Sequence, residues 1–218
     1  MYGGMALALC VQSAGPRADT LEAGGYSFSD EMGGFRLKTV RGAGTPDRPF
    51  VIVEELKSHA PAILTVRKLP EKPVRSFSPS IAPSQGVQIK LEVVAINKTG
   101  RIWVGYDLEL QEKLHIPSTH GDGLSFDQLR KKAADVSANK FASVDRFFEP
   151  HDRIHFFKGH VNPGDSLEFA VHITDVTPTA IFYFVQEPRF LFARKDGGTA
   201  LAAASSKQTL TSTEKGGY

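Results

Sequence analysis

The chain has 218 residues, a formal net charge of +2 and a hydrophobic fraction of 41%. This length holds one large domain, or one domain with a smaller appendage, and this composition builds a core without disulfides or a structural metal. The near balance of 26 basic and 24 acidic residues argues against nucleic acid as the main partner, because phosphate binding needs a clustered basic surface. The sequence implies no cofactor.

The first 20 residues have features of a secretory signal. Met5–Val11 is a short apolar run, and small and polar residues follow it at 12–15. No Lys or Arg precedes the run. We expect residues 1–20 to be a signal segment and the mature protein to be periplasmic or secreted, with a loosely packed N-terminus as the alternative. Lipidation of Cys10 is a minority interpretation, because Leu9 is bulkier than the small residue normally required before the lipidated cysteine. No later segment is apolar enough to predict a transmembrane span.

Residues 21–69 predict an N-terminal β-meander. Alternation of apolar and polar residues predicts a strand over 35–39, and β-prone runs predict two more over 50–56 and 62–67. The segment 70–86 then holds four prolines and four serines. Such density of proline removes backbone donors, so we expect a linker or a crossover between sheets here.

The clearest predicted hairpin joins residues 87–93 to residues 102–110. Both segments alternate, and the turn residues 97–100 end in Gly100, which accepts a positive φ. The alternation places Val104 on the inward face and Trp103 on the opposite face, where the Trp103 ring either meets a sugar or partner or packs beneath the segment 111–146. We favour packing.

The pattern weakens over 111–146, where Ser125 and Gln128 predict the cap of a short helix that runs toward Ala134. A second hairpin is predicted from residues 154–156 and 167–173. The following run 180–185 is apolar on both faces, as in a central strand.

About eight strands with short turns predict an all-β, antiparallel two-sheet sandwich, Ig-like or jelly-roll-like, with a short helical excursion. A small barrel is the alternative. We expect residues 87–194 to form the main sandwich domain. Residues 195–218 contain Gly, Ala, Ser, Thr and Lys with two leucines, and predict a disordered tail.

Six of the seven histidines lie between positions 115 and 172, which raises the question of a metal site. The weak candidate ligands are His120, Asp122, Asp127, His155 and His172. If the strands of the second hairpin pair, His155 and His172 become neighbours on its solvent face. Surface histidines on strands explain the pattern better, because no known ligand spacing is present.

The loop 120–127 is the most site-like segment, because Asp122 and Asp127 offer oxygens and the glycines permit a sharp turn. It lacks the regular run of oxygen ligands of an EF-hand. A structural loop, in which Asp122 caps a turn and Leu124 and Phe126 enter the core, is the favoured interpretation.

Catalytic motifs are absent from the sequence. It contains no Gly-x-Ser-x-Gly motif and no glycine-rich phosphate loop. The adjacent carboxylates Glu54 and Glu55 point to opposite faces of a strand and cannot act on one bond. Whether the protein is an enzyme is therefore left open by the sequence.

Three functions remain. The favoured hypothesis is an exported, non-catalytic module of the cell envelope or extracellular space that binds a protein or glycan partner through loops or a sheet edge. The alternatives are a metal-dependent enzyme that uses the His-rich C-terminal half, and a structural subunit that assembles by strand pairing. Fold class alone does not choose among them.

Overall fold

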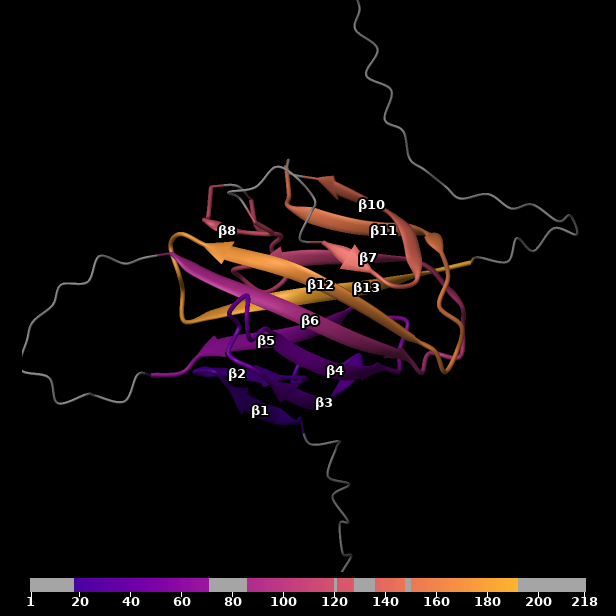
Figure 1. Ribbon diagram of the computed structural model, residues 1–218, viewed down its shortest axis with the longest axis horizontal. Helices are drawn as coiled ribbons and strands as arrows, with labels where there is room; N and C mark the ends of the chain where they lie inside the picture. Colours follow the sequence, from indigo (N-terminus) through magenta and orange to yellow (C-terminus); the bar gives the residue numbers. More distant parts are fainter. Residues whose placement is uncertain (1–17, 71–85, 120, 128–135, 148–149, 192–218) are drawn as a thin grey trace, which may run out of the picture.

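The computed structural model describes residues 18–70, 86–119, 121–127, 136–147 and 150–191, which consist of strands and loops (Figure 1). The N-terminal strands are β1 (Thr20–Ala23), β2 (Tyr26–Ser29), β3 (Phe35–Arg41), β4 (Phe50–Leu56) and β5 (Ala62–Lys68). The later strands are β6 (Val87–Asn97), β7 (Trp103–Gln111), β8 (Leu124–Ser125), β9 (Ser137–Ala138), β10 (Phe141–Phe147), β11 (Arg153–Gly159), β12 (Ser166–Asp175) and β13 (Ile181–Phe190). Within the described ranges we find no helix with the length and apolar character of a membrane span.

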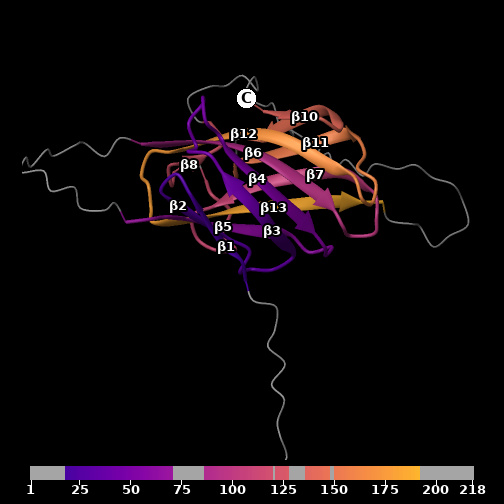
Figure 2. The same cartoon turned by 60° about the horizontal axis from the view of Figure 1, so that its bottom comes forward.

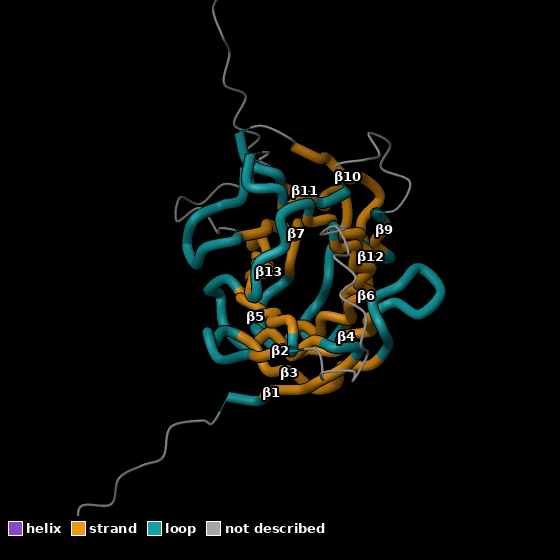
Figure 3. Tube along the Cα trace, turned by 90° about the vertical axis from the view of Figure 1, so that its left-hand side faces the viewer, coloured by secondary structure: helices purple, strands orange, loops and turns teal. Residues whose placement is uncertain are grey.

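The strands form two sheets that lie face to face, in a sandwich-like arrangement (Figure 3). Sheet A has the order β1-β2-β5-β13-β7-β11-β10, and sheet B has the order β3-β4-β6-β12-β8 with β9 also paired to β12. The predicted all-β, two-sheet architecture is confirmed. Strands from both sides of the segment 71–85 contribute to each sheet, since β4 pairs with β6 and β5 pairs with β13.

The prediction of an entirely antiparallel sandwich is wrong at one position. Strand β4 runs parallel to β6, with Phe50 opposite Leu91 and Leu56 opposite Asn97. A parallel neighbour requires a long crossover rather than a tight turn. The chain makes that crossover by passing through β5 in sheet A before it returns to sheet B as β6.

Both predicted hairpins are wrong as pairings, although their strands exist. Strand β6 belongs to sheet B and β7 to sheet A, so the turn after β6 crosses between the sheets. Strand β11 likewise lies in sheet A, while β12 pairs with β6 over all ten of its residues. Alternation fixes which side chains face inward, but it does not specify which strand is the neighbour.

Asn97 stabilises the crossing from β6 to β7. Its fully buried side chain donates hydrogen bonds to the carbonyl oxygens of Arg101 (2.8 Å) and Val161 (3.1 Å). Its Oδ1 accepts hydrogen bonds from the backbone N–H and the hydroxyl of Thr99. The side-chain amide of Asn97 therefore makes hydrogen bonds within the turn, to Thr99 and Arg101, and connects the turn to Val161, which follows β11.

The faces predicted for Val104 and Trp103 are corrected by a bulge. The register with β13 shifts there, since Arg189 lies opposite Gly105 but Phe190 lies opposite Trp103. The extra residue reverses the alternation toward the N-terminal end of β7. Trp103 is consequently fully buried, against Tyr106, and its indole N–H donates to Thr99 Oγ1, while Val104 is half-buried.

The predicted helical excursion is not seen. Ser125, the expected cap, lies in β8, which pairs with β12 through Thr174. An extended backbone is favoured here because it points the side chains of Leu124 and Phe126 into the core, where each is about 1% exposed. The remainder of the predicted helix, with Gln128, lies outside the described residues. So do residues 1–17 of the predicted signal segment 1–20, most of the predicted linker 70–86, and the predicted tail 195–218.

The core lies between the sheets and is rich in aromatic rings. Phe169 of β12, 3% exposed, contacts Phe156, Tyr106 and Phe184 from sheet A. Phe50 of sheet B similarly contacts Phe28 of sheet A. The inward face of β13 also carries Pro188. The pairing of β13 with β5 ends at Gln186, so the N–H that proline lacks is not needed for a hydrogen bond to β5.

Candidate functional site

The structure separates the two histidines that the sequence places together. His155 lies on the outer face of β11 in sheet A, and His172 lies on the outer face of β12 in sheet B. The expectation that they are neighbours is wrong, because the strands that carry them belong to different sheets. His120 lies outside the described residues.

The loop 121–127 has the structural character that we favoured from the sequence. Asp122 accepts hydrogen bonds from the backbone N–H groups of Leu124 (3.1 Å) and Thr119 (3.1 Å). These bonds hold the turn that carries Leu124 and Phe126 into the core. Both Asp122 oxygens thus have partners from the backbone.

Asp127, at the end of this loop, lies close to His172 of β12. The distance from Asp127 Oδ2 to His172 Nδ1 is 3.9 Å, and both side chains are largely buried. Asp127 has a φ of 53°, which is costly for a residue with a Cβ. In the described ranges, no group of three or more His, Cys, Asp or Glu side chains is placed to hold a metal ion.

A buried ionic cluster that the sequence did not reveal closes the gap between β8 and the pair β10–β11. Asp152 Oδ2 accepts hydrogen bonds from the Ser125 hydroxyl and, at 2.7 Å, from the Phe126 N–H. The guanidinium of Arg146 lies 3.5 Å from the same oxygen and donates to the Asp127 carbonyl. Burial raises the pKa of Asp152, although these bonds oppose the shift. The cluster joins an edge of sheet B to an edge of sheet A.

The outer face of sheet A carries a second ionic network. Asp107 of β7 lies opposite His155 of β11 and Glu187 of β13. Its Oδ1 pairs with His155 Nδ1, and its Oδ2 accepts hydrogen bonds from Arg189 (2.8 Å to Nε). Burial favours a higher pKa for Asp107, but the hydrogen bonds from His155 and Arg189 outweigh it and hold the pKa below its ordinary value.

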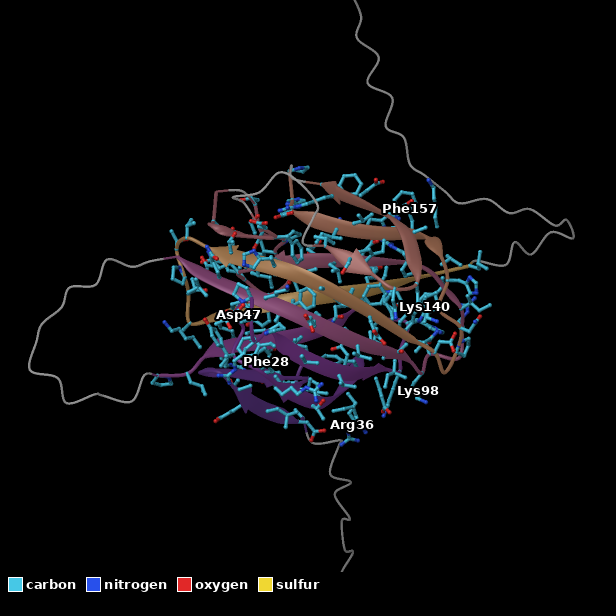
Figure 4. All side chains as sticks on the ribbon, in the orientation of Figure 1. Phe28, Arg36, Asp47, Lys98, Lys140 and Phe157 are labelled. Carbon is cyan, nitrogen blue, oxygen red and sulfur yellow. The ribbon has the colours of Figure 1, made fainter. Side chains whose placement is uncertain are left out.

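Gly105 has no side chain, which gives room for the side chains of His155 and Arg189 in this network. A Cβ on Gly105 would lie 3.2 Å from His155 Cε1 and 3.4 Å from Arg189 Cβ. The imidazole of His155 stacks on the ring of Phe157, with 5.4 Å between the ring centroids, and the Lys158 ammonium lies over the same Phe157 ring. Phe157 is labelled in Figure 4, near β10 and β11. The outer face therefore presents a mixture of paired charges and aromatic surface.

Strand β10 forms the margin of this face. Among the described strands it pairs in its sheet with β11 alone, from Phe141 opposite Gly159 to Phe147 opposite Arg153. Asp145 is exposed, and Phe147 is 51% exposed. One long side of the β10 backbone is thus left without a ladder partner in the described part of the chain.

The opposite margin of the sandwich differs. There the edge strand β1 of sheet A lies beside the edge strand β3 of sheet B, whereas β10 contacts sheet B through the two-residue strand β9 (Figure 2). Arg36 of β3 pairs with Asp19 just before β1 at 3.1 Å. The edge at β10 is consequently the better candidate for contact with another chain.

A shallow hollow lies at the end of the sandwich, where both sheets approach residues 175–179. It measures about 330 Å³, including space open to solvent. Its lining is Tyr26, Lys68, Val87, Ile89, Leu124, Ile173, Asp175, Pro178, Thr179 and Phe182. Burial, and then the charge of Asp175, raises the pKa of Tyr26, and burial also raises the pKa of Asp175.

Comparison with known proteins gives no match to a family model, to a curated protein or to a solved structure. The function must therefore be inferred from the edge, the face and the buried groups described above.

Proposed function

We propose that this protein is an exported, non-catalytic binding module that recognises an extended segment of a protein partner along the edge of β10. The partner segment adds a strand to sheet A next to Phe141–Phe147. Backbone hydrogen bonds supply affinity in this mode of recognition, and alternate side chains supply specificity. The observation that carries the proposal is the unpaired side of β10, in a sandwich whose opposite margin is covered.

The side chains along this edge indicate the chemistry of the partner. Phe147 supplies exposed apolar surface. The residues opposite it across the sheet form one row: Arg153 on β11 and then Glu109 on β7, which make an ion pair with each other. Asp145 begins the adjacent row, which continues through His155 to Asp107. A segment with an apolar residue opposite Phe147 and a basic residue opposite Asp145 satisfies both rows.

A protein partner is favoured over a glycan. Sugar-binding sites commonly use exposed aromatic rings as platforms, and the single tryptophan of the chain, Trp103, is fully buried. The exposed ring nearest the edge, Phe147, stands beside unpaired backbone, which suits strand addition.

Selection of peptides from a displayed random library on the full-length chain tests this proposal. We expect the selected peptides to lose at least tenfold in affinity for Phe147→Lys, because a lysine on an edge strand opposes strand addition. Val176→Lys is the matched control, since Val176 is also 51% exposed but follows β12. Peptides that bind both variants as tightly as the wild type would contradict the proposal.

Assembly by strand pairing between copies of the chain is the second candidate, and the same edge favours it. Light scattering separates the two: a monomer over a wide concentration range supports a foreign partner, and a dimer abolished by Phe147→Lys supports self-assembly. We also propose that the fold is Ig-like or jelly-roll-like, supported by the connections β6–β7 and β11–β12 that cross between sheets. The proposal of export rests on the apolar run Met5–Val11.

A further inference from the structure

Glu54 is a carboxyl group placed inside the sandwich. It occupies an inward position of β4, in the series Phe50, Ile52, Glu54 and Leu56, and its exposed fraction is 0%. In the sheet it lies opposite Leu37 of β3 and Ala95 of β6, neither of which has a polar side chain. The carboxyl group thus lies on a face that is otherwise apolar.

The groups that face Glu54 from sheet A are neutral. Gln186 of β13 and Tyr106 of β7 are both fully buried, and the Tyr106 hydroxyl donates to Gln186 Oε1 at 3.1 Å. Among the described residues, no group meets hydrogen-bond geometry with Gln186 Nε2 or with either carboxyl oxygen of Glu54. Tyr106 is the titratable group that faces Glu54, and burial raises its pKa well above the ordinary value, so it stays neutral as well.

An isolated carboxylate in such surroundings is strongly disfavoured, because the group is fully buried and no cationic side chain of the described residues pairs with it. We propose that Glu54 is a proton-binding site in the core, occupied in the folded protein at neutral pH, and that loss of this proton weakens the association of β4 with sheet A. Gln186 and Tyr106 form the neutral polar side of the site. The fold thereby contains a device that responds to alkaline pH.

The direction of the pH dependence follows from the two states. Burial raises the pKa of Glu54 to about 8, with the amide of Gln186 acting in the opposite direction. In the unfolded chain the group has an ordinary pKa near ~4.3. The folded protein therefore holds the proton over the interval between these values, and its stability falls as pH rises through that interval. The difference corresponds to a rise of about 5,000-fold in the unfolding constant, complete above pH ~8.

Denaturant unfolding of the full-length wild type and of Glu54→Gln tests the proposal, with Trp103 fluorescence as the signal. The ratio of the wild-type to the variant unfolding constant should rise close to tenfold per pH unit between about pH 5 and 8, then level off. Glu55→Gln is the control. Glu55 points outward near Lys57, whose hydrogen bond lowers its pKa, so this variant should behave as the wild type over the same interval.

Infrared spectroscopy of the wild type provides a readout that does not depend on the stability of any variant. A carboxylic-acid C=O band from Glu54 should persist at neutral pH and disappear with a midpoint near the pKa of about 8. A pH-independent ratio of unfolding constants, or the absence of a protonated carboxyl group above pH ~6, would overturn the proposal.

Discussion

Asp152 and Phe126 connect the two sheets through a hydrogen bond of 2.7 Å, from the Phe126 backbone N–H to Asp152 Oδ2. Phe126 follows β8 at the edge of sheet B, and Asp152 precedes β11 of sheet A. The same oxygen also holds the Ser125 hydroxyl and lies 3.5 Å from Arg146. Removal of this carboxylate therefore takes away the acceptor of the Ser125 hydroxyl and of the Phe126 N–H, together with an ion-pair partner of Arg146.

We expect Asp152→Ala to lower the free energy of unfolding by about 3–5 kcal/mol, because it removes the buried carboxylate that pairs with Arg146 and accepts hydrogen bonds from Ser125 and Phe126. Asp145→Ala, at an exposed position of β10, should cost within about 0.5 kcal/mol. Urea denaturation measures both values. Equal and small losses would show that the cluster does not join the sheets.

The core prediction concerns neighbouring residues of β12. Phe169 is 3% exposed and contacts rings from the opposite sheet, whereas Glu168 is exposed. Phe169→Ala should cost about 3–5 kcal/mol through the cavity it leaves, and Glu168→Ala about 0.5 kcal/mol or less. Similar costs for the two changes would mean that the inward face of β12 is assigned incorrectly.

Asn97 tests the crossing between the sheets. Asn97→Ala removes the two hydrogen bonds that the amide donates to the carbonyl oxygens of Arg101 and Val161 and the two that it accepts from Thr99. The expected loss is about 2–3 kcal/mol, given the usual net contribution of each hydrogen bond. Lys98→Ala, at the exposed next position, serves as the control. A stability of Asn97→Ala close to that of the control would show that the turn holds without the amide.

We expect the contribution of Asp107 to the free energy of unfolding to be lost in acid. Its folded pKa lies below the ordinary value, with hydrogen bonds from His155 and Arg189 outweighing the effect of burial. Such a group stabilises the fold above its unfolded pKa, and the contribution disappears as pH falls through the folded pKa. Asp107→Asn should therefore cost about 1 kcal/mol near neutral pH and much less in strong acid. A cost that is unchanged on acidification would contradict the ion-pair account. Asp47→Asn, in an exposed loop, is the control.

Export is tested by the mass of the protein from its native host. The apolar run and the small residues after it predict a mature N-terminus between about residues 14 and 20. Intact-mass spectrometry of the purified protein locates that end. Retention of Met1 in soluble cytoplasmic material would end the hypothesis.

The sequence predicted strands better than it predicted their neighbours. The runs 50–56 and 62–67 coincide with β4 and β5, because β-prone residues and alternation act locally. Pairing depends on contacts between distant residues. The turn after β6 has the chemistry of a hairpin, yet Asn97 uses its side chain to cross between sheets. The bulge beside Gly105 likewise reversed the face of Trp103, which alternation alone does not anticipate.

The candidate site was less accessible from sequence. The metal candidates His155 and His172 were brought together by the expected pairing of the strands that carry them, whereas their partners in the structure are the distant Asp107 and Asp127. One signal for the core proton site was present: Glu54 interrupts the inward series of an apolar strand. The sequence showed that Glu54 and Glu55 face opposite sides, but only the second sheet reveals that no cation meets Glu54.

The open edge of β10 is the central claim of this account, and residue-resolved amide hydrogen exchange tests it most directly. Alternate N–H groups of an antiparallel edge strand point away from its neighbour. In the monomeric protein, alternate amides of Phe141–Phe147 should therefore exchange rapidly while those bonded to β11 are protected. A selected peptide should slow the rapid set and leave the protected set unchanged. Uniform protection along β10 in the free monomer, or rapid amides that the bound peptide leaves unaffected, would contradict recognition by strand addition.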